Sequence, residues 1–252
     1  KQSFPLDVRN YRSKKREKFL RNKGYRISSW RSPELGIKKS IKIMKKPLLR
    51  GYFHEWMFFV SIGACIPLIS KSSNSIELTA TIVYSIGIFM MFGFSALYHR
   101  VKWRPKVLKI MRRLDHSSIF IMIAGTFTPI CLLVLPKETG LQLLLIIWVI
   151  AGIGILQAVL FTNLPRMIRA GLYLIAGYVA IPYLSIMSSV MGVTNLALTI
   201  AGGTIYSVGA ISYGLKFPDF SPKYFGYHEF FHVLVCIAAI LHFIVIYSIV
   251  GN

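Results

Sequence analysis

Seven long apolar segments follow a polar stretch at the start of the chain. Each has about 19 to 24 residues, enough for an α-helix to cross a hydrocarbon core of roughly 30 Å. Charged residues are concentrated before the first segment and in the short connections. The pattern predicts an all-α membrane protein, a bundle of seven transmembrane helices. The predicted spans are residues 52–70, 76–99, 115–135, 141–162, 170–191, 195–215 and 228–250.

The composition supports this fold class. Apolar residues make up 54% of the chain, charged residues only 15%, and the mean hydropathy is +0.57, whereas a soluble domain carries more charge. Cys65, Cys131 and Cys236 lie inside apolar segments without CxxC spacing, so we expect packing residues rather than disulfides. The chain is expected to be a multi-pass integral protein of the plasma membrane or an endomembrane.

The net charge of +21 would suggest a nucleic-acid partner if the basic residues formed one face. They do not, because 17 of the 30 lie in residues 1–50 and most others lie in connections. We therefore expect no nucleic-acid partner. Residues 1–46 are predicted to be a basic, disordered arm, and residues 47–252 the transmembrane domain. The arm and the 100–113 loop are expected to contact anionic lipid headgroups.

The distribution of Lys and Arg also predicts the orientation. If the arm is cytoplasmic, the segments on that side hold 28 of the 30 basic residues, and the opposite side keeps only Lys71 and Lys137. Basic residues favour the cytoplasmic side of a membrane. We therefore expect a cytoplasmic N-terminus, with the C-terminus on the opposite side.

Polar side chains recur at the predicted cytoplasmic ends of three spans. Ser95 and His99 are four residues apart at the end of the second span, and Asp115 begins the third. His228 and His232 begin the seventh, and a spacing of four places both on one face of a helix. Because successive spans alternate in direction, these groups reach a similar membrane depth.

Three imidazoles with a carboxylate or water are the ligand set of a catalytic zinc site with an open position. Zinc lowers the pKa of bound water to about 7, and it also polarises an amide carbonyl. Asp115 could accept the water proton and pass it to a leaving amine. At headgroup depth, the accessible substrate is a lipid amide or ester. The sequence thus favours Zn²⁺-dependent lipid hydrolysis.

Each of these residues also has a simpler interpretation. Asp115 could cap its helix, since a carboxylate is favoured at a helix N-terminus. Ser95 could be a packing serine between helices. His228 and His232 could hold a structural zinc or hydrogen-bond between helices without metal.

Other polar residues near these spans are expected to play lesser roles. His116 is expected to contact the site without ligating, and His54 to support it. His242 is too deep to share the metal, since it lies ten residues, roughly 15 Å, beyond His232. Glu229 is expected to face the headgroups and Tyr227 to join an interfacial aromatic belt.

Three blocks of the sequence resemble the signature of a known family. They are Ser95–Arg100 (SALYHR), Leu114–Pro129 (beginning LDHSS) and His228–His232 (HEFFH), and the segment 46–54 resembles the start of the first span in one subgroup. The spaced blocks are similar to those of the hemolysin III family, the microbial branch of the progestin and adipoQ receptor family that includes the adiponectin receptors. The resemblance covers residues 46–250 and leaves the arm outside.

The resemblance implies a seven-helix bundle with zinc near the cytoplasmic end. It implies that His99, His228 and His232 are the zinc ligands. It also implies that Asp115 holds a zinc-bound water and that Ser95 forms a hydrogen bond in the layer of residues around the ligands. Related membrane hydrolases include alkaline ceramidases, and the adiponectin receptors are associated with ceramidase activity. Hemolysin III members are associated with pore-forming cytolysis.

Three functions are therefore expected in order of preference. The first is a zinc-dependent hydrolase of lipid amides, with a ceramide-like membrane lipid as substrate. The second is a pore-forming cytolysin. No span shows an amphipathic pore-lining stripe, but an oligomer, which is possible here, could form a pore without one. The third is a receptor or sensor in which zinc is structural.

Overall fold

The computed structural model describes residues 26–28, 42–44, 47–221 and 223–251. Most of the basic arm, expected to be disordered over residues 1–46, lies outside the described residues. Within the arm, strands β1 (Arg26–Ser28) and β2 (Lys42–Met44) pair in a two-stranded antiparallel sheet. Ile27 is aligned with Ile43 in this sheet.

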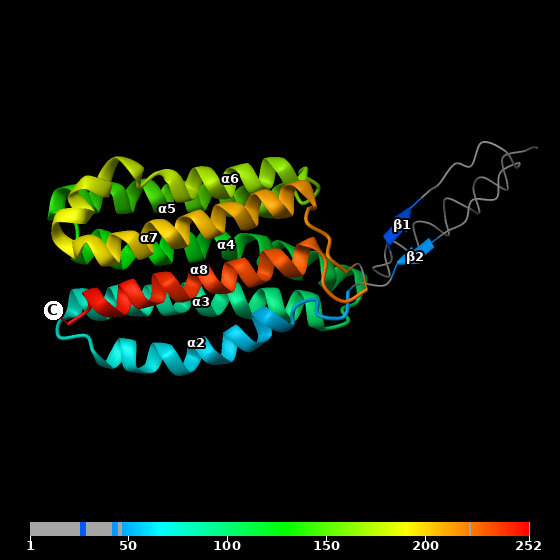
Figure 1. Cartoon of the computed structure of the whole chain (residues 1–252), viewed down its shortest axis with the longest axis horizontal. Helices are drawn as coiled ribbons and strands as arrows, with labels where there is room; N and C mark the ends of the chain where they lie inside the picture. Colours follow the sequence, from blue (N-terminus) through cyan, green and yellow to red (C-terminus); the bar gives the residue numbers. More distant parts are fainter. Residues whose placement is uncertain (1–25, 29–41, 45–46, 222, 252) are drawn as a thin grey trace, which may run out of the picture.

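Long helices lie side by side in one bundle from residue 52 onward (Figure 1). Neighbours in sequence pack together, and α8 lies between α7 on one side and α2 and α3 on the other. The helices are α2 (Tyr52–Ser70), α3 (Ser75–Arg100), α4 (Pro105–Leu133), α5 (Lys137–Leu160), α6 (Arg166–Tyr178), α7 (Leu184–Leu215) and α8 (Tyr227–Ile249).

Six stretches of this described bundle are long and apolar enough to cross a membrane, which makes the chain a multi-pass integral membrane protein. The predicted first, second, fourth and last spans agree with α2, α3, α5 and α8 to within about one helical turn. The fifth and sixth predicted spans fall together in one stretch of 50 residues, Arg166–Leu215.

This 50-residue stretch doubles back on itself. Its helical geometry is interrupted by the 3₁₀ turn η1 (Ile181–Tyr183) and again at Gly192, where φ is 78° and ψ is 164°. Only glycine adopts such a conformation without strain. The Tyr178 hydroxyl at the end of α6 lies 2.8 Å from that of Ser207, so the second part of α7 returns alongside α6 (Figure 1). The stretch can hold two crossings. The count of seven spans and the orientation of the termini stay predictions.

The start of α4 differs from the sequence-based expectation. The helix begins at Pro105, ten residues before the predicted third span, so most of the expected 100–113 loop is helical. Proline suits the first helical position because its missing N–H would have no partner there. Met111 is buried while Lys106 and Lys109 are exposed, so these first turns are amphipathic rather than continuously apolar. A search for long apolar runs therefore missed them.

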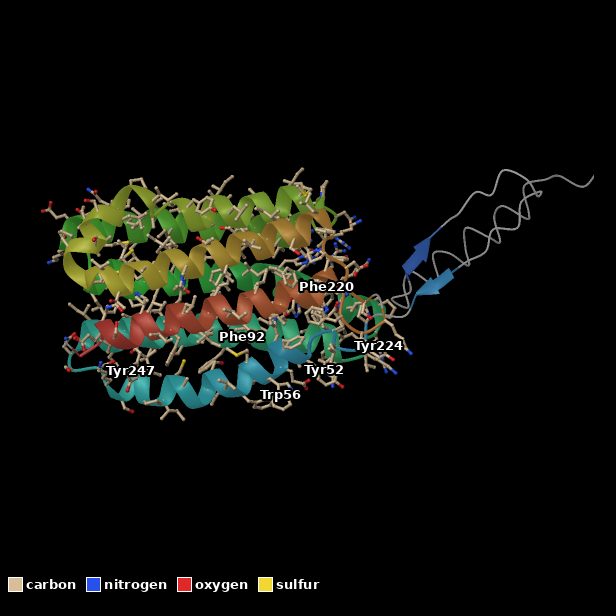
Figure 2. All side chains as sticks on the ribbon, viewed as in Figure 1. Tyr52, Trp56, Phe92, Phe220, Tyr224 and Tyr247 are labelled. Carbon is tan, nitrogen blue, oxygen red and sulfur yellow. The ribbon has the colours of Figure 1, made fainter. Side chains whose placement is uncertain are left out.

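Large apolar side chains cover the outside of the bundle as well as its interior (Figure 2). Trp56 on α2 is 72% exposed, whereas Phe92 on α3 is buried among α2, α3 and α8. A second core cluster joins α4 and α5 to the 166–215 stretch. Exposed apolar surface of this extent is typical of contact with lipid rather than water.

A glycine sets the close approach of α4 and α5. A Cβ added at Gly140 would lie 2.1 Å from the carbonyl oxygen of Cys131, a backbone atom that cannot move alone. Gly140→Ala is therefore expected to lower the free energy of unfolding by about 1–3 kcal/mol, the usual cost of overpacking. Gly152→Ala, on the same helix with nothing within 4 Å of the added Cβ, is the control. Thermal unfolding in detergent measures both, and equal midpoints would contradict the predicted contact.

Candidate metal centre

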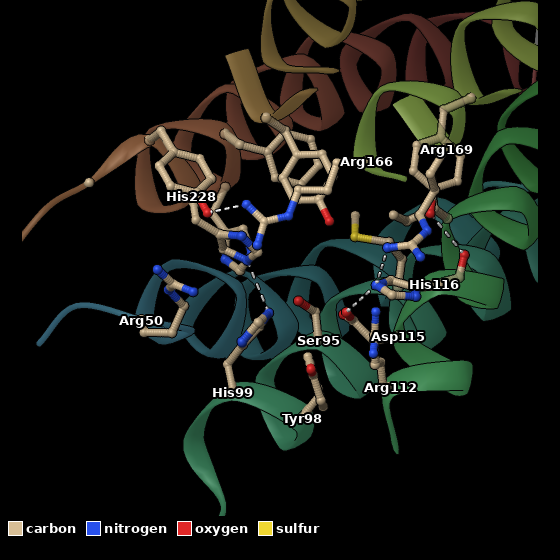
Figure 3. Close-up of a pocket in the computed structure, with 18 of the residues that line it drawn as sticks. Arg50, Ser95, Tyr98, His99, Arg112, Asp115, His116, Arg166, Arg169 and His228 are labelled. Carbon is tan, nitrogen blue, oxygen red and sulfur yellow. Dashed lines mark hydrogen bonds and ion pairs between the residues drawn. The ribbon is translucent and has the colours of Figure 1, made fainter. Parts of the chain in front are cut away.

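The sequence-predicted site residues line one cavity of about 490 Å³ at the end of the bundle where α3 ends and α8 begins (Figure 3). We call it the polar chamber. Its lining includes Arg50, Ser95, Tyr98, His99, Arg112, Asp115, His116, Arg166, Arg169, His228 and His232.

Three histidines converge in the polar chamber. His99 comes from the last turn of α3, and His228 and His232 occupy successive turns of α8. The Nε2 atoms of His99 and His228 are 3.2 Å apart, and the His99 and His232 ring centroids are 5.1 Å apart. One ligand nitrogen from each of the three lies within 4.8 Å of the other two. Two distant segments of the chain thus bring together a group that can hold a metal ion.

The geometry of this group suits a tetrahedral metal. With Zn–N bonds of about 2.0–2.1 Å, two ligand nitrogens on a tetrahedral zinc lie about 3.3 Å apart. The 3.2 Å between His99 and His228 matches that separation. His232 is buried and its Nδ1 has no hydrogen-bond partner among the described residues. A buried nitrogen without a partner is costly, and a ligated imidazole is neutral, so the residues present fit a metal ion.

Asp115 lies beside the histidines rather than among them. It is the eleventh residue of α4, so the interpretation of Asp115 as a helix cap is wrong. Its carboxyl group is buried and lies close enough to the Ser95 side chain to interact with it. The chamber therefore holds a carboxylate that is available to a water or substrate next to the three imidazoles. The catalytic roles of Asp115 and Ser95 stay predictions.

Comparison with known proteins identifies the family of the chain. A family model described as "Haemolysin-III related" matches residues 42–243, which include all five of the predicted site residues. The chain belongs to the haemolysin-III related family. "Hemolysin-3" of Bacillus cereus is 35% identical over 175 residues, covering 68% of this chain and 78% of that protein.

Relatives from animals also match this haemolysin-III related chain. The "Adiponectin receptor protein" of Drosophila melanogaster is 28% identical over 202 residues, covering 72% of this chain but 46% of that protein. The human "Monocyte to macrophage differentiation factor" is 24% identical over 201 residues, covering 78% of this chain and 81% of that protein.

Two further histidines of this haemolysin-III related chain contact the site residues. His116 has its Nε2 3.3 Å from Nη1 of Arg169 and 4.0 Å from the Asp115 carboxylate. His54 stacks on His232, with ring centroids 3.8 Å apart and an interplanar angle of 6°. Neither belongs to the group of three, which agrees with the expected supporting positions. His242 lies deeper, with its Nε2 3.2 Å from the Thr199 carbonyl oxygen.

Glu229 and Tyr227 do not lie where the sequence-based interpretation put them. Glu229 is fully buried, forms an ion pair with Arg50 and accepts a hydrogen bond of 2.8 Å from the Gly226 backbone N–H. Tyr227 is buried too, and its hydroxyl accepts a hydrogen bond from Arg166. Glu229 is the third residue of its helix, where a Glu side chain reaches back to cap the N-terminus, and that signal could have placed it.

The basic residues on α6 were missed as parts of the site. Arg166 and Arg169 stand in the first turn of α6 and line the polar chamber. Arg169 is only 3% exposed, and its Nη2 donates to the Leu164 carbonyl at 3.2 Å. In a count of charged residues along the chain, both arginines are interpreted only as residues that determine the orientation in the membrane. Their inward position follows from the packing of α6 on α4, which one sequence does not reveal.

A glycine next to His99 offers a test of the metal centre. Gly51 has a φ of 85°, and a Cβ added there would lie 2.6 Å from the His99 Cβ. Gly51→Ala is expected to weaken metal binding about 10–100-fold, the effect of disturbing the support of a ligand. Gly63→Ala on α2, where the added Cβ meets nothing within 4 Å, should bind metal normally. Metal titration in detergent measures both, and equal affinities would refute the predicted displacement of His99.

A second, apolar cavity adjoins the polar chamber inside the bundle. Its volume is about 310 Å³, and we call it the apolar cavity. Met91, Ile119, Tyr173 and Phe231 line both spaces. A space lined by polar and ionisable groups therefore lies next to one lined mostly by apolar groups.

Proposed function

We propose that this haemolysin-III related chain is a zinc-dependent membrane hydrolase of lipid amides. The observation that carries the proposal is the convergence of His99, His228 and His232 next to the buried Asp115. Three imidazoles with an open position form the usual protein environment of a catalytic rather than a closed structural zinc. The adjoining apolar cavity supports a lipid as substrate.

The residues of the chamber have separate tasks in this proposal. His99, His228 and His232 hold Zn²⁺, which supplies Lewis acidity and acidified water when it is bound. Asp115 accepts the proton of the attacking water and delivers it to the leaving amine. Ser95, beside Asp115, orients the carboxylate by hydrogen bonding. His116 contacts Asp115 from the other side and restricts its movement.

The two cavities suggest how a substrate lies. An acyl chain fills the apolar cavity, because its lining offers surroundings as apolar as the hydrocarbon core that the chain leaves. The amide bond then lies at the junction of the two spaces, near the three histidines. The amine portion extends into the polar chamber. A ceramide-like lipid offers one acyl chain, one amide and the hydroxyl groups of its amine portion, whose own hydrocarbon chain would stay in the surrounding lipid.

The experiment that tests the proposal uses purified full-length protein in mixed micelles. A panel of lipid amides, including a ceramide, is compared with lipid esters of the same acyl chain. We expect hydrolysis of an amide that a chelator abolishes and Zn²⁺ restores. Intact lipids across the whole panel with metal-loaded protein would overturn the hydrolase proposal.

The name of one relative favours a second candidate function. The Bacillus cereus protein at 35% identity is called a hemolysin, so pore formation is the alternative for this chain. Pore formation predicts leakage of small but not large dyes from lipid vesicles, and retention of both dyes at a high protein-to-lipid ratio would exclude it.

A receptor with a structural zinc is the third candidate, and the relative named as an adiponectin receptor favours it. A structural site would tolerate the loss of Asp115, whereas a catalytic site would not.

A further inference from the structure

Positive charge exceeds negative charge in the polar chamber. Four arginines line it, against the two aspartates Asp115 and Asp219. Arg50 is already balanced by Glu229, which is buried against it. Asp219 is exposed, and one of its oxygens accepts a hydrogen bond from the Tyr227 N–H. Three arginines therefore share one buried carboxylate, and a divalent metal adds further positive charge.

Arg112 has no hydrogen bond or ion pair with any other described residue. It is half-buried on α4, one turn before Asp115, and its guanidinium lies near enough to the Asp115 carboxylate to interact with its charge. A guanidinium offers five N–H donors in a planar fork. An unpaired fork that lines a chamber leaves these donors available to an anion.

Arg169 adds a second set of donors. It is almost fully buried, and its Nε has no hydrogen-bond partner among the described residues. Its remaining contacts are to the Thr162 and Leu164 carbonyls and to Nε2 of His116. It forms no ion pair with a carboxylate of the described residues. Figure 3 shows Arg112 and Arg169 both directed toward His116 and Asp115.

The start of α6 supplies further positive potential. Arg166 is its first residue, donates to the Tyr227 hydroxyl and lines the chamber. No side chain caps this 13-residue helix, and Leu164 and Pro165 just before it also line the chamber. Unpaired N–H groups at a helix N-terminus attract phosphate through the helix dipole. One space is thus lined by the guanidinium groups of three arginines, one of them with a buried Nε that has no partner among the described residues. The residues that begin an uncapped helix line it too.

We propose that Arg112, Arg166 and Arg169 form a subsite that binds the phosphate group of a lipid whose acyl chain occupies the apolar cavity. This inference rests on the proposed function and narrows its substrate class to lipid amides that carry a phosphate on the amine portion. Guanidinium groups bind phosphate oxygens in pairs, and three groups from two helices match an anion with several equivalent oxygens. The shared rim of Met91, Ile119, Tyr173 and Phe231 lets one molecule span both spaces.

The test is an equilibrium binding measurement with metal-loaded, full-length protein in a nonionic detergent. The probes are lysophosphatidic acid, the monoacylglycerol with the same chain, and inorganic phosphate alone. We expect the phosphate-bearing lipid to bind at least about tenfold more tightly than the neutral one, since charge-assisted hydrogen bonds are the strongest polar contacts. In Arg112→Gln and Arg166→Gln, this preference should fall to about threefold or less.

Lys109→Gln is the matched control. Lys109 lies one turn before Arg112 on α4, is exposed and does not line the chamber, so the variant removes one charge and should keep the preference. Arg112→Lys keeps the charge but not the planar set of donors, so it should retain part of the preference for the phosphate-bearing lipid. It also verifies that position 112 tolerates substitution. An equal loss in Lys109→Gln would overturn the proposal in favour of general surface charge.

The remaining outcomes separate the source of the phosphate and the two proposals. If inorganic phosphate bound as tightly as lysophosphatidic acid, the claim that the bound phosphate belongs to a lipid would be overturned. If the wild type bound the two lipids equally, the phosphate subsite itself would be overturned. The readout is binding, so it does not require turnover. Asp115→Asn should keep the phosphate preference even though it should lose hydrolysis. A wild type that prefers the phosphate-bearing lipid but leaves the whole panel of lipid amides intact would therefore refute the proposed function but not the subsite.

Discussion

Replacing Asp115 by asparagine is expected to lower the rate of lipid-amide hydrolysis by about 10²–10⁴-fold, the usual contribution of a positioned general acid or base. Asparagine has nearly the same shape but does not accept a proton. The buried Asp115 side chain would therefore keep its place beside Ser95 while losing its chemistry. Bound metal should remain, because Asp115 is not one of the three grouped ligands. Initial rates and metal content of the same sample measure the two effects.

The control for this variant is Glu55→Gln. It makes the same chemical change at the same end of the bundle, but Glu55 is partly exposed and paired with Arg100 at 2.7 Å. An exposed ion pair contributes about 0–1 kcal/mol, so activity should stay near that of the wild type. If Asp115→Asn and Glu55→Gln retained equal activity, Asp115 would have no catalytic role, and a structural metal would become the better account.

His232→Ala is expected to abolish metal binding under conditions in which the wild type is saturated. His232 is one of the three grouped imidazoles and is 2% exposed, so its removal leaves two of the three ligands. Loss of a supporting contact costs about 10–100-fold in metal affinity, and loss of a ligand should cost more. Elemental analysis of dialysed protein and competition with a chromophoric chelator give the metal content and the affinity.

His242→Ala is the matched control because it lies on the same helix. Its imidazole contacts the Thr199 carbonyl deep in the bundle and belongs to no metal group among the described residues. It should bind metal like the wild type, and equal loss in both variants would indicate a general effect on folding.

His54→Phe tests whether a fourth imidazole contributes. Phenylalanine keeps a flat ring against His232, where the centroids are now 3.8 Å apart, but has no ligand nitrogen. Metal content should be unchanged. A loss as large as that of His232→Ala would add His54 to the ligands.

The sequence revealed the spans and the three histidines because both depend on short-range patterns. A run of apolar residues predicts a membrane helix whatever it packs against, which is why α2 agrees with residues 52–70. His228 and His232 share a helix face by their spacing alone. His99 joined them through alternation of the spans, an argument about membrane depth that needs no contact information. The structure brings all three together.

Features that depend on packing between distant segments could not be predicted. The capping position of Glu229 could be recognised in the sequence, but its pairing with Arg50, which is 179 residues away, could not. Arg166 and Arg169 looked like orientation charges because nothing in α6 itself shows which of its faces meets α4. The first turns of α4 failed the apolar-run criterion, and Asp115 consequently appeared to start its helix instead of lying in its middle.

The central claim is that His99, His228 and His232 hold one metal ion. The most direct measurement is the metal content of detergent-purified wild-type protein, determined by elemental analysis beside the double variant His228→Ala/His232→Ala. The account predicts about one zinc per chain in the wild type, as expected for a single three-histidine site, and none above background in the variant. Wild-type protein without metal after purification in metal-replete buffer, or equal metal in the variant, would contradict it.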